Sequence, residues 1–425
     1  MTTPGDSQGI LLPGFPSPFQ AFVALTIDDP TSLRPWLRLL ALTIADSKAV
    51  EARKKEWKRT SQVRPVAGPL LSAIAFTASG LGKLGLDSTL LGSVRFPLQL
   101  RARAEEIDGA VLPDDLAHPD HWLCGGSYSG TDIMLIIAGD ERDQVTTRIA
   151  GLLRSAPRGI RVAHLDLGEK LVRDGSPIEH FGYADGISNA SSLPGPKDPA
   201  PGTVEDVTIK RSDLPSDAES WANDGVLATF RRLDQDVAAF MRYCERAARD
   251  ARGQGIEISA EEIGARLVGR WRSGTPLALS PDSDIALARD GNNAFDFQDD
   301  PEGIKTPVRA HIREESDRQN PTRPRMIRRG ISFGSAYPAR GPRGLLFLAF
   351  QPSLDIDLEN QPRRNNALLG CSPRSWAFYG RDRSGAQRRF EHRIEERFVT
   401  PRSGLYLFFP TKQGLQNMLL ERSVQ

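Results

Sequence analysis

The order of apolar and amphipathic segments constrains the fold of this chain more than any other sequence feature. Residues 19–27 and 131–139 are rich in apolar and β-branched side chains, which is typical of strands. Residues 33–57 and 141–153 carry apolar side chains at helical spacing. We therefore expect an α+β fold in which helices cover one face of an antiparallel sheet.

The same order of elements returns in the second half of the chain. Residues 225–231 predict a strand, and residues 234–252 predict an amphipathic helix. Ser259 and Glu262 have the spacing of a capping box, which predicts the start of another helix. Apolar strands are predicted at 344–351 and 404–410.

Two stretches without periodicity divide these elements. Residues 191–220 are rich in proline and charge and predict a linker, so we expect two domains, 1–205 and 206–425. Residues 273–325 are also long and polar, and a loop of this length is unusual unless it has a function.

Composition excludes several classes of protein. The formal net charge of +1 argues against attraction of the whole chain to nucleic acid or to an anionic membrane. Residues 1–8 lack a basic region followed by an apolar stretch, so we expect a cytoplasmic protein without a signal peptide. The three cysteines are far apart and match neither a haem-attachment motif nor a zinc set, so we expect buried, reduced thiols.

Two polar motifs are candidates for chemistry. His311 is one of only six histidines and lies in an arginine-rich part of the long loop. The string Gly182-Tyr-Ala-Asp185-Gly186 places one carboxylate between glycines, which permit a tight backbone path beside a ligand. Each motif also has an ordinary interpretation, because His311 could be a structural loop residue and Asp185-Gly186 a simple turn.

The chain resembles the dye-decolorising peroxidase family in three short stretches that follow the order of the family's motifs. They are Gly182-x-x-Asp185-Gly186, Ala310-His311-Ile312-Arg313 and Arg328-Arg-Gly-Ile-Ser-Phe333-Gly334. The resemblance implies two ferredoxin-like modules, with the Gly-x-x-Asp-Gly motif in the first module and haem b in the C-terminal one. It also implies a peroxidase that reduces hydrogen peroxide and oxidises bulky dyes, phenols or other aromatic reductants by one-electron steps.

Carried over to this sequence, the resemblance assigns a role to each motif. His311 would ligate the haem iron, Asp185 would be the distal acid–base group, and Arg328 would be the distal arginine. The chain departs from the family pattern at Ser332, where proline is common. Arg329, next to Arg328, leaves two guanidinium groups that could face the peroxide.

Further residues are predicted around the haem. Leu345 and Phe347 share one face of a predicted strand and could form the distal wall, although they could equally be ordinary sheet core. Arg313 and Arg328 could bind the propionates, and the alternative for Arg313 is a surface salt bridge. The acid that orients His311 cannot be chosen, but the candidates are the following: Asp355, Asp357 and Glu359.

Bulky reductants would need a route that does not enter the haem pocket. Tyr337, Trp376 and Tyr379 are candidates to relay electrons from the surface, unless they are simply half-buried in the fold. We expect no nucleic-acid or membrane partner, and a homo-oligomer is possible. The alternative functions are a haem carrier or sensor without peroxide chemistry, and a non-haem protein in which His311 is an ordinary loop residue.

Overall fold

The computed structural model describes residues 6–60, 68–104, 112–187, 204–287, 293, 295–315, 326–351, 353–354 and 374–420. Within these residues the main feature is one nine-stranded sheet, with the order β7-β13-β2-β3-β1-β4-β9-β10-β8. Its strands are β1 (Phe19–Ile27), β2 (Leu71–Phe76), β3 (Ile133–Gly139), β4 (Ile160–Glu169), β7 (Val226–Gln235), β8 (Ile327–Arg328), β9 (Ile331–Phe333), β10 (Gly344–Gln351) and β13 (Val399–Phe409).

The sheet closes on itself, because β7 pairs with β10 as well as with β13. Strands β8 and β9 follow one another along the opposite edge of β10. All of these pairings are antiparallel, so side chains alternate between the inside and the outside of a barrel. Phe22, Ile136, Phe230, Leu348 and Leu407 belong to one buried cluster that fills the inside.

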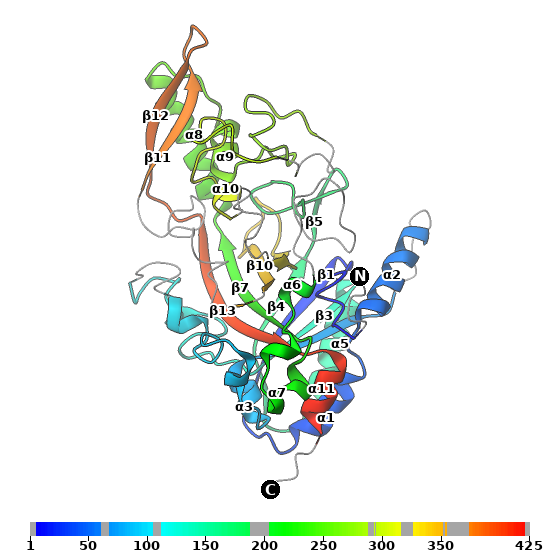
Figure 1. The fold of residues 1–425 in the computed structure, drawn as a ribbon. Helices are drawn as coiled ribbons and strands as arrows, with labels where there is room; N and C mark the ends of the chain where they lie inside the picture. The colour runs from blue at the N-terminus through cyan, green and yellow to red at the C-terminus, as the bar shows by residue number, and fades with distance from the viewer. Residues whose placement is uncertain are drawn as a thin grey trace.

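Helices cover the outside of the barrel in two groups, at opposite ends of the molecule (Figure 1). One group packs on strands of the N-terminal half and comprises α1 (Leu33–Ala41), α5 (Arg142–Arg154), α7 (Ser216–Ala222) and α11 (Lys412–Leu419). The other group comprises α8 (Val237–Gly253) and α9 (Ala260–Val268), which pack beside the hairpin of β11 (Arg374–Arg381) and β12 (Gln387–Ile394).

The remaining α-helices and strands are short or lie at the edges. They are α2 (Ser47–Thr60), α3 (Ala78–Lys83), α6 (Val204–Val207), α10 (His311–Glu315), β5 (Leu171–Arg173) and β6 (Ser176–Ile178). None of the helices in the described ranges is both long and apolar enough to cross a membrane. Cys124 and Cys244 are buried and free, and burial raises the pKa of each thiol to about 12. Cys371 lies outside the described residues.

The α+β class, the antiparallel sheet and the helices on its outer face are confirmed. The prediction of one helix over 33–57 was wrong. The chain leaves helical geometry after Ala41, and Ile44 pairs with Ser72 before α2 begins at Ser47. Asp46 also pairs with Gln8, so two distant segments draw this stretch out of helical geometry. Sequence periodicity does not record contacts with distant segments.

The hairpin β11–β12 was not predicted, and neither was the closure of the barrel. Helices α7 and α11 come from the second half of the chain but pack with α1 in the N-terminal group. The division into 1–205 and 206–425 therefore stays a prediction about chain order, because side-chain packing crosses that boundary.

Candidate active site

The outer face of β10 carries the first part of the site. Arg328 lies opposite Ala349, and Ser332 lies opposite Leu345. Directly paired residues of antiparallel strands point to the same side, so Arg328 shares a face with Leu345 and Phe347. Leu345 and Phe347 are only half-buried although β10 has partner strands along both edges. This face thus presents two incompletely covered apolar side chains beside a guanidinium.

The structure distinguishes the two neighbouring arginines. Arg329 alternates to the other side of the strand, where its Nε donates to the carbonyl oxygen of Leu11 at 3.0 Å. Burial, together with the charge of Arg328, lowers the pKa of Arg329 to about 10. Arg329 therefore fastens the N-terminal segment, and Arg328 is the arginine that faces the candidate site.

The loop that carries Asp185 is held in a tight path. The backbone N–H of Asp185 donates to the carbonyl oxygen of Pro177 at 2.9 Å, and the carboxylate of Asp185 accepts from the N–H of Gly186 at 2.6 Å. Gly182 has a φ of +91°, and a Cβ there would lie 2.3 Å from Nη1 of Arg272. Only glycine tolerates both the left-handed backbone and this close approach. The structure therefore explains why glycine occupies position 182 of the motif.

His311 begins helix α10 and is half-buried. The next residue, Ile312, packs against the end of α9, because a Cβ on Gly269 would lie 2.4 Å from its Cγ1. Shortly after this point, the carbonyl of Arg272 accepts from the N–H of Ala184 at 3.0 Å. The segment Gly269–Arg272 therefore contacts both the His311 helix and the Asp185 loop.

A histidine joins the Asp185 loop to β9, the strand that follows Arg328 along the chain. His180 is buried, and its Nε2 lies 2.7 Å from the carbonyl oxygen of Phe333. Since a carbonyl can only accept, Nε2 carries the proton. Burial lowers the pKa of His180, which favours this neutral form. The three motifs are thus linked in space, although the chain separates them widely.

Arg313 has partners in its own loop. Its guanidinium donates to Asp300 Oδ2 at 3.2 Å and to the carbonyl oxygen of Thr306 at 2.7 Å. It also lies over the ring of Phe297, 4.8 Å from the ring centroid. A propionate at Arg313 would compete with these contacts. The pair with Asp300 is largely buried, so it is not the surface salt bridge considered as the alternative.

The candidate relay aromatics differ in exposure. Tyr337 is 47% exposed, Tyr379 is half-buried, and Trp376 is only 2% exposed. Trp376 therefore cannot be a surface residue touched by a bulky dye, because it faces the core beneath α8. Asp355, Asp357 and Glu359 lie outside the described residues.

Sequence reasoning missed Arg272, which contacts the Asp185 loop through its backbone and its side chain. Nη1 donates to the carbonyl oxygen of Phe181 at 2.6 Å, and the guanidinium lies 5.4 Å from the Tyr183 ring centroid. No local signal distinguishes this arginine from the many others in the chain, because its partners are distant in sequence.

Comparison with known proteins agrees with this architecture. Residues 6–168 match the family model of the DyP dimeric alpha+beta barrel domain. "Peroxidase 2" of Mycetinis scorodonius is 29% identical, with 97% of this chain and 87% of the relative aligned. "Multifunctional dye peroxidase DyP2" of an Amycolatopsis strain is 28% identical, over 73% of this chain and 70% of the relative.

Solved structures show the same fold. An ancestral D-type dye-decolorizing peroxidase superposes with a TM-score of 0.78 at 25% identity, covering 99% of this chain and 100% of that one. A dye-decolorizing peroxidase solved with 2,6-dimethoxyphenol superposes with a TM-score of 0.77 at 23% identity, with coverages of 99% and 100%.

Proposed function

We propose that this chain, which belongs to the dye-decolorising peroxidase family, reduces hydrogen peroxide and oxidises dyes and phenols by one-electron steps. One structural observation carries the proposal. The His311 helix and the Asp185 loop both contact Gly269–Arg272, and His180 ties the same loop to the strand that follows Arg328. An imidazole, a carboxylate and a guanidinium therefore come from segments that pack on one another.

The described residues fit haem b as the cofactor. A flat apolar group requires an apolar wall, and Leu345 and Phe347 remain half-buried on a strand with neighbours along both edges. His311 would hold the iron and Arg328 would meet a propionate. Arg313, also predicted for a propionate, would have to exchange its contacts with Asp300 and Thr306 for it. When bound, the haem would supply the redox-active iron at which peroxide is reduced.

Asp185 and Arg328 would carry the proton and charge chemistry. Peroxide must lose a proton from one oxygen and gain one on the other, and a carboxylate within reach of both can take and return it. Arg328 would stabilise the negative charge that develops on the departing oxygen. The N–H of Gly186 donates to Asp185 Oδ1 at 2.6 Å, and this hydrogen bond helps to orient the carboxylate.

Substituting Asp185 tests this function. We expect Asp185→Asn to slow the reaction with one equivalent of peroxide by about 10²- to 10⁴-fold, because the proton acceptor is lost. Stopped-flow absorbance of the haem-loaded protein measures this rate, and the ferric spectrum before mixing reports haem binding. A variant that binds haem but keeps the wild-type rate would contradict the proposal and favour a carrier or sensor.

Asp174 offers a matched control for this experiment. Asp174-Gly175 is also an Asp-Gly pair, and it forms the exposed turn between β5 and β6. Asp174→Asn should therefore react with peroxide as the wild type does.

The cytoplasmic location and the homo-oligomer inferred from the sequence stay predictions.

A further inference from the structure

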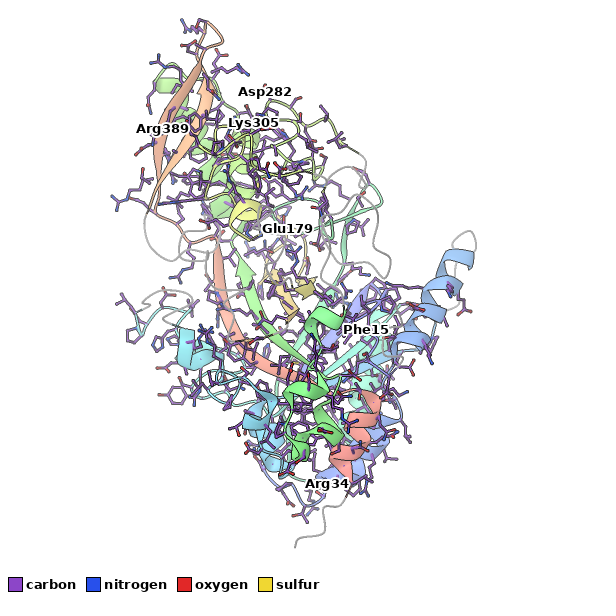
Figure 2. All side chains as sticks on the ribbon, viewed as in Figure 1. Phe15, Arg34, Glu179, Asp282, Lys305 and Arg389 are labelled. Atoms are coloured by element: carbon purple, nitrogen blue, oxygen red, sulfur yellow. The ribbon has the colours of Figure 1, made fainter. Side chains whose placement is uncertain are left out.

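Glu179 lies three residues before Gly182 of the Gly-x-x-Asp-Gly motif, and its carboxylate accepts hydrogen bonds from three N–H groups. Oε1 accepts from the N–H of Tyr183 at 2.9 Å, and Oε2 accepts from the N–H of Phe181 at 2.9 Å. Oε2 also accepts from Nε2 of Gln235 at 2.8 Å. Figure 2 labels Glu179 between the barrel and the part of the molecule that carries α8 and α9.

The backbone around Glu179 closes the same loop. Its N–H donates to the carbonyl of Tyr183 at 3.0 Å, and its carbonyl accepts from Gly182 at 2.9 Å. Ile178 and Ala184 form an isolated antiparallel bridge directly beside Asp185. Side chain and main chain of one residue thus fold the loop back on itself, and Asp185 is the first residue beyond the bridge.

Gln235 extends this network to the second half of the chain. It is the last residue of β7, and its backbone N–H donates to the carbonyl of Arg343 at 2.8 Å. The Asp185 loop is therefore fastened to the end of a barrel strand. On the same side, Phe181 packs on Phe240 of α8 with a centroid distance of 4.6 Å.

The donor set matches a carboxylate, because each oxygen of Glu179 accepts at least one N–H. An amide NH2 in place of either oxygen would therefore meet another donor. The pKa of Glu179 is raised, because burial, together with the charge of Asp185, outweighs the three N–H donors, which act in the opposite direction. Glutamine cannot replace these contacts, because its Nε2 would face at least one backbone N–H.

We propose that Glu179 is a positioning residue for peroxide reduction, whose carboxylate holds the loop so that Asp185 is presented to the peroxide. This inference rests on the proposed function. Glu179 takes no part in proton transfer, since its oxygens are occupied by the loop and by Gln235. Its effect on the reaction therefore passes entirely through Asp185.

A double-mutant cycle tests this dependence in the haem-loaded full chain. Glu179→Gln should slow the reaction with peroxide on the order of 10²-fold, as expected when a catalytic group is misplaced. In the Asp185→Asn background the same substitution should cost almost nothing, because the group it positions is gone. Losses that multiply in the double variant would overturn the proposal.

A second measurement uses the protein without haem. Hydrogen exchange should become faster at the amides of Phe181 and Tyr183 in Glu179→Gln, because both lose or weaken their acceptor. Unchanged exchange at both amides would overturn the proposal. Asp382→Asn is the control, since Asp382 also accepts a backbone N–H, from Ser384 at 2.9 Å, but lies in the turn between β11 and β12. It should leave the peroxide rate unchanged.

The outcomes separate this inference from the proposed function. If Asp185→Asn itself reacts normally, the proposed function fails. If Asp185→Asn is slow and Glu179→Gln is normal, only the positioning role fails. Should Glu179→Gln not fold, Gln235→Met removes one donor and leaves the loop's own bonds. It should give a smaller loss that again disappears with Asp185→Asn, and a loss that persists would overturn the proposal.

Discussion

Arg328 and Arg329 are chemically identical neighbours, yet the structure gives them different tasks. Alternation along the strand sends Arg328 to the half-covered outer face and Arg329 to the side of Leu11. Gly14 shows how closely the second arginine fits, because a Cβ there would lie 2.6 Å from Nε of Arg329. At the scale of single residues, alternation along the strand decides which arginine shares a face with Leu345 and Phe347.

His180 should make stability depend on pH. Burial lowers its pKa, so below about pH 6.5 the unfolded chain takes up a proton that the folded ring resists. The free energy of unfolding should therefore fall as the pH is lowered from 7.5 to 5. His180→Gln can still donate to Phe333 through its amide but cannot titrate, so it should show a shallower slope. Urea unfolding at several pH values measures this, and identical slopes would contradict the prediction.

At the scale of elements, α9 is the support of the site. Its start is a capping box in which Ser259 Oγ accepts from Glu262 N–H at 3.1 Å and Glu262 accepts from Ser259, as predicted from sequence. Its end is Gly269, with a φ of +93°, followed by the segment that contacts both the His311 helix and the Asp185 loop. The position of this helix end therefore sets the spacing of two site segments.

Gly269→Ala should disturb the His311 helix. A Cβ would be strained at positive φ, at a cost of about 1–3 kcal/mol, and would collide with Ile312. We expect lower stability in urea unfolding and weaker binding in a haem titration followed by absorbance. Gly253→Ala in α8 is the control, because no atom lies within 4 Å of its new Cβ, and it should bind haem normally. Normal haem binding by Gly269→Ala would show that α10 does not depend on this contact.

At the scale of the whole molecule, the barrel joins the two halves of the chain. Strand β4 of the first half pairs with β9 through Gly168 and Phe333, and β13 pairs with β2 through Phe408 and Phe76. Inside the barrel, Asp166 of β4 accepts from Arg232 of β7, and both side chains are less than a tenth exposed. The same guanidinium lies 4.1 Å from the centroid of the Phe333 ring.

Removing Arg232 should destabilise the entire fold. Arg232→Met leaves Asp166 buried without this cation, and the expected loss is about 3–5 kcal/mol in urea unfolding. Adding Asp166→Asn should recover part of the loss, because the buried charge is removed. Arg161→Met breaks the exposed pair with Asp28 and should change stability little. A loss in Arg232→Met no greater than in Arg161→Met would contradict this account.

Local pattern in the sequence determined most of the strands, the start of α9 and the order of the three motifs. These features depend on neighbouring residues, since alternation, helical spacing and capping act over a few positions. The resemblance to the dye-decolorising peroxidase family, and not local pattern, predicted that a carboxylate, an imidazole and a guanidinium belong to one site. Local pattern did not predict that helix 33–57 breaks or that β11 and β12 form a hairpin.

Only the tertiary structure decided how these parts meet. Closure of the barrel through β7 and β10, the choice between Arg328 and Arg329, and the burial of Trp376 all depend on contacts between distant segments. The contacts of Gly269–Arg272 with the His311 helix and the Asp185 loop also join segments that are distant in the sequence. The physical reason is that the free energy of such contacts depends on packing and burial once all elements are in place, and no short stretch of sequence contains that information.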